Sequence, residues 1–407
     1  MTLDRAGRRR CLGIGAGVLA LGAGGLVRTH ASTVPRSSQG LRPALNVGPT
    51  RSIQTLKDAA SIARDGDVVL VDAAEYRGDV AVWSQRQLVI RGVSDPQGAP
   101  PKVIADGASA EGKGIFVIRG DDVRVENIVF TGSRVRERNG AGIRHERGRL
   151  TVYRCRFEDN ENGILTANEP TLELYVLEST FIGNGSGDGF SHNLYAGSIS
   201  RLEVTGSYFA RTRVGHLLKS RARNTVVQYS RLSAEDGTSS YELDLPAGGE
   251  ALIIGNMIQQ GRTTENSTLV SFGAEGYAWP RNELLMAFNT LINDRPQGGV
   301  FVSARAGNAE ARLMHNLLVG RATVEVRSPL TSIGNVEAAA KSFAAASDFD
   351  YRLRLNAREV GGAGSYGSIE PRLRPTRSYV HPARSSALEA MTVLTPLSPG
   401  AFQQLAP

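Results

Sequence analysis

A repeat with a period of about 26 residues is the feature that most constrains how this 407-residue chain can fold. Short runs of β-forming residues each end on a small residue, then any residue, then a large apolar one. The apolar positions follow one another at regular intervals and are Phe130, Phe157, Phe181, Phe209, Leu232, Ile258, Leu291 and Leu318. A period of this length is typical of a solenoid, in which each repeat packs against its neighbours.

A second column of residues runs beside the apolar one. Two positions before each apolar residue from Phe157 onward stand Cys155, Ser179, Ser207, Ser230, Asn256, Asn289 and Asn316. Such small polar side chains can hydrogen bond to neighbouring backbone where coils stack. A repeat of about 24–28 residues accommodates three short strands and three turns. We therefore predict an all-β, single-domain, right-handed parallel β-helix over residues 50–335.

The two ends of the solenoid carry their own signals. Apolar residues at helical spacing over 53–63, followed by Asp65-Gly66-Asp67, predict a short capping helix before a first strand at 68–71. Residues 32–49 are polar, contain proline and glycine, and are predicted to be a linker. Residues 336–407 are predicted to form a C-terminal capping segment. The 46 glycines argue against a helical bundle, because glycine weakens helices and favours turns.

The N-terminus has the pattern of an export signal. Basic residues precede an uncharged stretch from Cys11 to Val27, which is too short and weakly apolar for a membrane span. The run Arg8-Arg9-Arg10-Cys11-Leu12 resembles a twin-arginine signal. We predict a signal peptide at residues 1–31 and a periplasmic or secreted protein. An ordinary secretory signal and an uncleaved anchor are the alternatives.

Removing that signal changes the charge and cysteine counts. Five arginines and Asp4 leave with it, so the formal charge falls from +7 to +3. Cys155 then remains without a disulfide partner. No recognised nucleic-acid motif occurs, and export argues against such a partner. We predict a monomer with no membrane span after signal removal and no cofactor, since no cluster of Cys and His suggests a metal.

The most polar coils lie between Asp188 and Gly249. If Leu194, Leu218 and Leu243 point into the core, their spacing of about 24–25 residues matches the repeat. Strand alternation then directs Tyr195, Lys219 and Asp244 outward in one column. A second column contains His192, His216 and Tyr241. By the same strand alternation, Asn193 and Glu242 are also expected to point outward. Stacked coils lie about 4.8 Å apart, so these side chains could meet one sugar unit.

This combination suits removal of a proton beside a carboxylate, as on C5 of a uronic acid. The reaction needs a cation to stabilise the developing enolate and a base within reach. Lys219, Arg221 or Arg223 could neutralise the substrate carboxylate, while His192, His216 or Tyr195 could be the base or the acid. We predict His192, Tyr195, His216 and Lys219 as catalytic residues. The predicted substrate-binding residues are Asn193, Arg221, Arg223, Glu242 and Asp244.

Three resemblances bear on the chemistry. The capping pattern at 53–63 resembles the start of secreted β-helix polysaccharide enzymes, a likeness that extends over roughly residues 45–405. The run Asp188-Gly-Phe-Ser-His192-Asn193, with Gly215-His216 after it, resembles the active-site coils of alginate C5-epimerases, which implies His192 as a base. Lys219-Ser220, followed by Asn224, resembles calcium-assisted alginate and dermatan lyases, in which the lysine is the base. Their calcium-binding acids would fall at Thr212 and Val214, so the ligand pattern does not support calcium.

A run of arginines adds a basic feature that could line a groove for an anionic polymer. Its members are Arg134, Arg136, Arg138, Arg144, Arg147, Arg149, Arg154 and Arg156.

The sequence thus predicts a lyase that acts by β-elimination on an acidic, uronate-containing polysaccharide. A C5-epimerase is the first alternative, because both reactions begin with the same proton abstraction. The second is a non-catalytic β-helix that binds glycans or acts as a scaffold, with the histidines as a hydrogen-bonded turn pair and the charged residues as ordinary surface groups.

Overall fold

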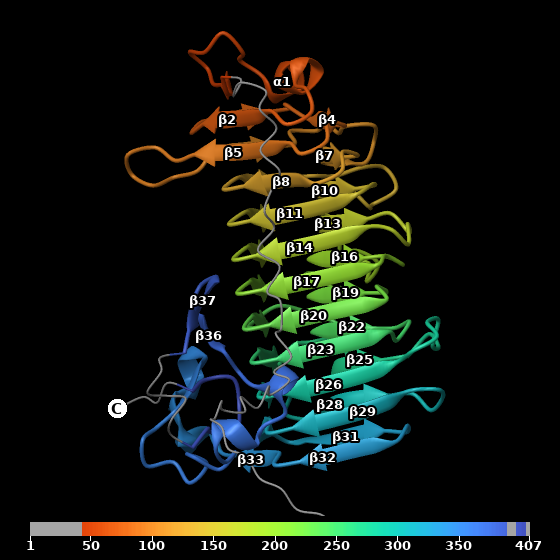
Figure 1. Cartoon of the computed structure of the whole chain (residues 1–407), viewed down its shortest axis with the longest axis vertical. Helices are drawn as coiled ribbons and strands as arrows, with labels where there is room; N and C mark the ends of the chain where they lie inside the picture. Colours follow the sequence, from red (N-terminus) through yellow and green to blue (C-terminus); the bar gives the residue numbers. More distant parts are fainter. Residues whose placement is uncertain (1–42, 389–395, 404–407) are drawn as a thin grey trace, which may run out of the picture. The chain divides into compact units, whose positions relative to one another are not determined.

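The chain winds through three long parallel sheets and adds one strand to each sheet per coil (Figure 1). The computed structural model describes residues 43–388 and 396–403. The predicted signal peptide at 1–31 lies outside these residues. We call the 12-stranded sheet A, the 11-stranded sheet B and the 10-stranded sheet C. All three pair only parallel strands, so the predicted parallel β-helix is confirmed.

The strands of each sheet follow the coil order. Sheet A contains β1 (Leu45–Val47), β2 (Val68–Asp72), β5 (Val89–Val93), β8 (Val123–Glu126), β11 (Arg149–Tyr153), β14 (Glu173–Leu177), β17 (Arg201–Thr205), β20 (Asn224–Gln228), β23 (Glu250–Ile254), β26 (Glu283–Ala287), β29 (Glu310–Met314) and β32 (Leu330–Ile333). Sheet B contains β3 (Glu75–Arg77), β6 (Lys102–Ile104), β9 (Val129–Thr131), β12 (Arg156–Glu158), β15 (Thr180–Ile182), β18 (Tyr208–Ala210), β21 (Arg231–Ser233), β24 (Met257–Gln260), β27 (Thr290–Asn293), β30 (Leu317–Gly320) and β33 (Val336–Ala338). Sheet C contains β4 (Ala81–Trp83), β7 (Gly114–Ile118), β10 (Ala141–His145), β13 (Asn162–Thr166), β16 (Leu194–Ala196), β19 (Leu218–Ser220), β22 (Leu243–Leu245), β25 (Thr268–Phe272), β28 (Gly299–Ala304) and β31 (Ala322–Val326).

The predicted apolar column fills the interior behind sheet B. Its members from Phe130 to Leu318 are direct partners from one coil to the next. The rings of Phe157 and Phe181 stack with centroids 4.7 Å apart, and Phe181 stacks on Phe209 at 4.5 Å. Each of these rings is fully buried. Burial of such large apolar surfaces is what holds one coil on the next.

The predicted polar column forms a continuous ladder in the turn between sheets A and B. The backbone N–H of Ser179 donates to Ser207 Oγ at 3.2 Å, and the N–H of Asn256 donates to Asn289 Oδ1 at 3.0 Å. The same bond recurs at the other rungs from Cys155 to Asn316. Each rung satisfies a buried donor that the tight turn would otherwise leave without an acceptor.

A short helix covers the first coil, as the sequence predicted. Helix α1 (Leu56–Ile62) begins at Thr55, whose side chain accepts a hydrogen bond from the N–H of Asp58 at 3.0 Å. Leu56, Ala59 and Ala60 face the core. Strand β1 lies inside the predicted linker at 32–49, where Leu45, Asn46 and Val47 pair with β2 and extend sheet A by one strand.

The segment after β33 folds back on the solenoid. It contains η1 (Ala340–Ser342), β34 (Phe343–Ala345), η2 (Ala346–Asp348), β35 (Asp350–Leu353), η3 (Tyr366–Ser368), η4 (Pro371–Leu373), β36 (Arg377–Val380) and β37 (Arg384–Ala387). Phe343, Tyr351 and Leu353 pack on Met257 and Leu317, which point outward from sheet B. Among the helices of residues 43–388 and 396–403, none is long and apolar enough to cross a membrane.

Candidate active site

The predicted register around the polar coils is present in sheet C. Leu194 pairs with Leu218, and Leu218 pairs with Leu243. All three leucines are fully buried. The neighbouring residues therefore point to the outer face of the sheet, where Tyr195 pairs with Lys219 and Lys219 pairs with Asp244.

Lys219 lies at the centre of this outer column. Its Nζ is 3.3 Å from Asp244 Oδ2 on the next coil and 5.9 Å from the centre of the Tyr195 ring on the previous one. Its side chain is only 13% exposed, so its ammonium group is largely shielded from bulk water. The column continues in both directions, to Arg144 two coils before Tyr195 and to Ser271 one coil after Asp244.

A loop between β25 and β26 adds a residue that the sequence did not reveal. Glu275 in this loop forms an ion pair with Arg221 at 2.6 Å and lies 3.6 Å from Lys219 Nζ. Arg221 also donates a hydrogen bond to the Tyr195 hydroxyl, and its carbonyl oxygen accepts one from Trp279 Nε1 at 3.1 Å. The sequence did carry a signal for this loop. The interval between Ile258 and Leu291 is the longest in the apolar column and marks an enlarged coil, whose extra residues include this loop.

The two predicted catalytic histidines form a stacked pair beside the column. Their ring centres are 4.6 Å apart, and His192 Nδ1 accepts the backbone N–H of His216 at 3.0 Å. His216 Nδ1 accepts the N–H of Tyr241 at 3.3 Å, so the proton of each neutral ring is on Nε2. Burial lowers the pKa of His216 to about 3 and also lowers that of His192. Neither imidazole is therefore suited to accept a proton near neutral pH.

His216 Nε2 lies 3.5 Å from Asp244 Oδ2, the carboxylate oxygen that also faces Lys219. The imidazole thus faces the Asp244 carboxylate beside the Lys219 ammonium. Burial raises the pKa of Asp244, and the nearby Lys219 ammonium opposes this rise. Burial also raises the pKa of Tyr195, while Arg221 opposes it, so the phenol is protonated at neutral pH.

Two predicted substrate-binding residues point inward, which corrects their expected orientation. Asn193 is fully buried, and its Oδ1 accepts from Asn184 Nδ2 at 2.7 Å. Glu242 is also fully buried and accepts from Ser239 Oγ at 3.1 Å. Both precede the first residue of their strand, where the turn ends the in-and-out alternation on which the prediction relied. Arg223 is exposed in the turn after β19, and none of the described side chains of the site contacts it.

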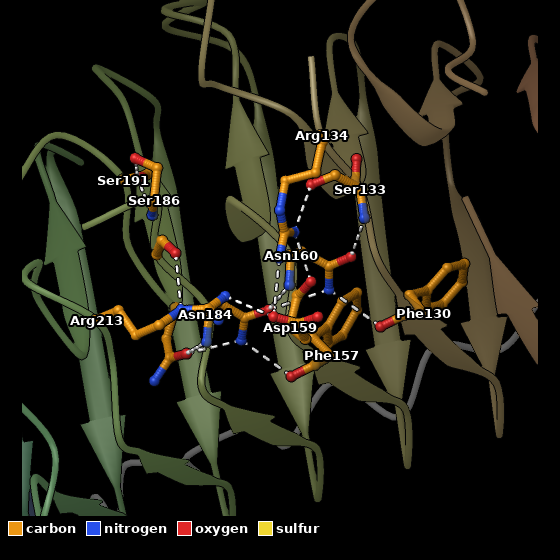
Figure 2. A network of polar contacts seen from close by, with 12 residues as sticks. Phe130, Ser133, Arg134, Phe157, Asp159, Asn160, Asn184, Ser186, Ser191 and Arg213 are labelled. Carbon is orange, nitrogen blue, oxygen red and sulfur yellow. Dashed lines mark hydrogen bonds and ion pairs between the residues drawn. The ribbon is translucent and has the colours of Figure 1, made fainter. Parts of the chain in front are cut away.

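Asn184 belongs to a second asparagine ladder at the edge of sheet C (Figure 2). Asn160 Nδ2 donates to Asn184 Oδ1 at 3.0 Å, and Asn184 in turn donates to Asn193. Figure 2 also shows Arg134 and Arg213 converging on Asp159, at 2.8 and 2.7 Å. The buried ladder thus fixes the turn that leads into β16.

The arginine run does not gather in one groove. Arg134 belongs to the turn beside sheet C and Arg144 to its outer column, whereas Arg149 pairs with Glu173 on sheet A. Arg156 pairs with Glu158 on sheet B. Because neighbouring residues lie on different sheets, only Arg144 shares the outer column of Lys219.

A calcium site of the kind implied by the lyase resemblance does not fit the residues present. At the two positions of the expected acids, Thr212 is fully buried and Val214 offers no oxygen in its side chain. Within the described ranges, no group of three or more His, Cys, Asp or Glu side chains could hold a metal ion.

Comparisons with known proteins bear on the fold. The structure of pectate lyase Pel9A superimposes with a TM-score of 0.58 at 11% identity, covering 88% of this chain and 96% of that one. ORF18 of Geobacillus virus E2 gives a TM-score of 0.45 at 13% identity, covering 70% and 57% of the two chains. A variant of the PL6 family alginate lyase AlyGC gives 0.31 at 14% identity, covering 77% and 58%. No family model and no curated protein sequence matches the chain. The likeness to Pel9A shows that the chain has the right-handed parallel β-helix fold.

Proposed function

We propose that this protein is an exported lyase that cleaves an acidic, uronate-containing polysaccharide by β-elimination. One observation carries the proposal. Tyr195, Lys219 and Asp244 occupy successive coils on the outer face of sheet C, with Arg221 bound to the Tyr195 hydroxyl. Two cations and a phenol thus lie within the span of a sugar unit, on the face of the solenoid that the C-terminal segment does not cover.

The cations supply the binding and the enolate stabilisation. The uronate carboxylate binds between Lys219 Nζ and the Arg221 guanidinium, where it replaces Glu275 as the partner of both. A largely buried ammonium group stabilises negative charge more strongly than an exposed one, because water screens it less. Arg144, on the same column, is placed for the carboxylate of a neighbouring sugar.

The Tyr195 oxygen carries the proton. As phenolate it takes the proton from C5 of the bound uronate, and the electron pair of the broken C–H bond passes into the carboxylate as an enolate. The enolate then expels the oxygen at C4, which receives the proton from Tyr195. The products are a shortened chain and a chain that ends in an unsaturated uronate. His216 positions Asp244, and Asp244 holds Lys219 in place.

The test is a product assay with the purified protein on alginate, pectate, glycosaminoglycans and bacterial exopolysaccharides. Ultraviolet absorbance from unsaturated chain ends supports the lyase. Deuterium taken from heavy water into an uncleaved polymer would instead assign a C5-epimerase. Saturable binding without either product would assign a glycan-binding or scaffold β-helix. No product and no binding with any polymer would overturn the proposal.

Variants connect the product to the proposed residues. Tyr195→Phe removes the proton-carrying oxygen and retains the ring, so cleavage is lost while the polymer still binds. His192→Ala tests the role assigned to the buried histidine pair. A positioning role predicts a moderate loss with an unchanged pH profile, whereas a catalytic base would change the profile.

A further inference from the structure

A cavity lies against the outer face of sheet B, under the C-terminal segment. Its volume is about 590 Å³, within the range of sites for drug-sized ligands. Tyr208 and Arg231 form its floor from β18 and β21, and Phe349 and Tyr379 line it from the C-terminal segment. None of these residues belongs to the column of Lys219, which lies on sheet C.

Arg231 is held from several sides in this cavity. It is only 6% exposed, and its guanidinium group lies 5.2 Å from the Tyr208 ring and 5.3 Å from the Phe349 ring. Its Nη2 donates to Glu235 Oε1 at 2.9 Å, and Nη1 lies 3.4 Å from His381 Nδ1. Its Nε is buried and has no acceptor among the described residues. This buried donor is unsatisfied, while Arg231 itself lines the cavity.

The charges of the lining indicate what kind of ligand fits. Three arginines face three carboxylates: Arg211, Arg231 and Arg352 against Glu235, Asp348 and Asp350. Burial lowers the pKa of His381, so it adds no charge at neutral pH. The lining is therefore electrically balanced. A polyanion would be attracted by the arginines but repelled by the carboxylates, so this lining gives it no net electrostatic attraction.

Aromatic faces set among paired donors and acceptors match a neutral sugar. The apolar C–H face of a pyranose packs on an aromatic ring, and its hydroxyl groups both donate to carboxylates and accept from guanidinium groups. A neighbouring cavity of about 360 Å³ shares Glu235 and Phe349 with the first and contains Gln259 and Asp294. The two cavities therefore adjoin at Glu235 and Phe349.

We infer that the cavity between sheet B and the C-terminal segment is a binding site for a neutral oligosaccharide, separate from the column of Lys219. The inference does not depend on the proposed lyase activity, because the two sites share no residue. A neutral stretch or branch of a mixed polysaccharide bound here would attach the protein to its polymer without occupying the outer face of sheet C.

The test is calorimetric titration of the full chain with cellotetraose, mannotetraose and xylotetraose, with tetragalacturonate as the acidic comparison. We expect at least one neutral tetrasaccharide to bind saturably. Val380→Trp places a large ring in the cavity, at a residue that is 39% exposed, and should weaken this binding at least tenfold. Arg231→Gln should do the same by removing the guanidinium group.

Two controls keep the result interpretable. Arg358→Gln changes an exposed arginine of the same segment that lines neither cavity and should leave binding unchanged. Lys219→Ala should also leave it unchanged, which separates this site from the proposed active site. Failure of all three neutral sugars, equal affinity for tetragalacturonate, or full binding by the Val380→Trp variant with an unchanged melting temperature would each overturn the inference.

Discussion

The outer faces of sheets B and C differ although both sheets are built from the same repeat. Outward residues of sheet B in the last coils include Met257, Ile292 and Leu317, which are apolar and are covered by the C-terminal segment. From Tyr195 to Ser271 the outward residues of this column of sheet C are polar or charged, and the side chains of Tyr195 and Lys219 remain partly exposed. The inner columns behind both sheets are mostly apolar.

The comparison separates what holds the solenoid together from what it can bind. Inward residues are constrained by packing on every coil, whereas an outward residue is free unless a neighbouring segment must cover it. Where the outer column is apolar, it requires a cover and contributes to stability. Where it is polar, it is free to contribute chemistry. This difference predicts that variants on the outer face of sheet C mainly change catalytic activity, whereas variants on the outer face of sheet B mainly change stability.

The largest expected effect is on the outer face of sheet C. Lys219→Ala should lower kcat/KM on the polymer by about 10²–10³-fold, because it removes a cation that stabilises the enolate. Some stability should also be lost, because the buried Asp244 carboxylate then has no cation facing it, so activity is compared well below the melting temperature of each variant. Ser303→Ala, in the same column three coils on, is the matched control and should retain full activity. Equal losses for both variants would contradict the assignment.

The opposite outcome is expected on the outer face of sheet B. Leu317 is 1% exposed beneath the C-terminal segment, so Leu317→Ala should destabilise the protein by about 2–4 kcal/mol. Urea denaturation followed by circular dichroism measures this loss. Leu330→Ala, at a leucine that is 41% exposed, should stay within about 0.5 kcal/mol of the parent protein. Activity measured well below the transition should be unaffected, and a large activity loss would link the two faces.

The pH dependence tests the proton carrier itself. Because the pKa of Tyr195 is raised above its usual value of 10, the phenolate fraction at neutral pH is small and grows as pH rises. The value of kcat/KM should therefore increase by about tenfold per pH unit between neutral pH and pH 9. The Tyr195→Phe variant should lose this dependence along with the activity. A bell-shaped profile centred near neutral pH would favour a histidine instead.

The smallest effect concerns the buried carboxyl group of Glu242. Burial raises its pKa, so the folded state retains a proton that the unfolded chain releases. The free energy of unfolding should therefore fall as pH rises from the ordinary carboxyl pKa through the raised one. Glu242→Gln should reduce the difference in stability between pH 5 and pH 8 by about 1 kcal/mol. An unchanged difference would mean that Glu242 titrates normally and is accessible to water.

Much of the fold and part of the candidate site could be predicted from the sequence. The repeat sets the register, and register alone brings Tyr195, Lys219 and Asp244 into one column. The same argument failed for Asn193 and Glu242, because alternation holds only within a strand and both precede one. Knowing where a strand begins requires the turn geometry, which the repeat does not specify.

Contacts made by segments outside the repeat could not be predicted. Glu275 reaches Arg221 across 54 residues because an enlarged loop reaches back over the sheet. The cavity on sheet B joins residues of β18 and β21 to Phe349 and Tyr379. No periodicity relates these positions, so their proximity depends on how non-repeating segments pack. The long interval before Leu291 locates the enlarged coil without revealing which coil its loop contacts.

The contact between the β25–β26 loop and Arg221 has a consequence for the order in which parts of the molecule form during synthesis. The coil that contains Arg221 can stack as soon as its own residues are available, because each coil needs only its neighbours. Its surroundings remain unfinished until Glu275 and Trp279 have been synthesised and β25 has been added. A chain that ends before this loop therefore has the stacked column but lacks the groups that anchor Arg221. Assembly of the scaffold precedes assembly of the site.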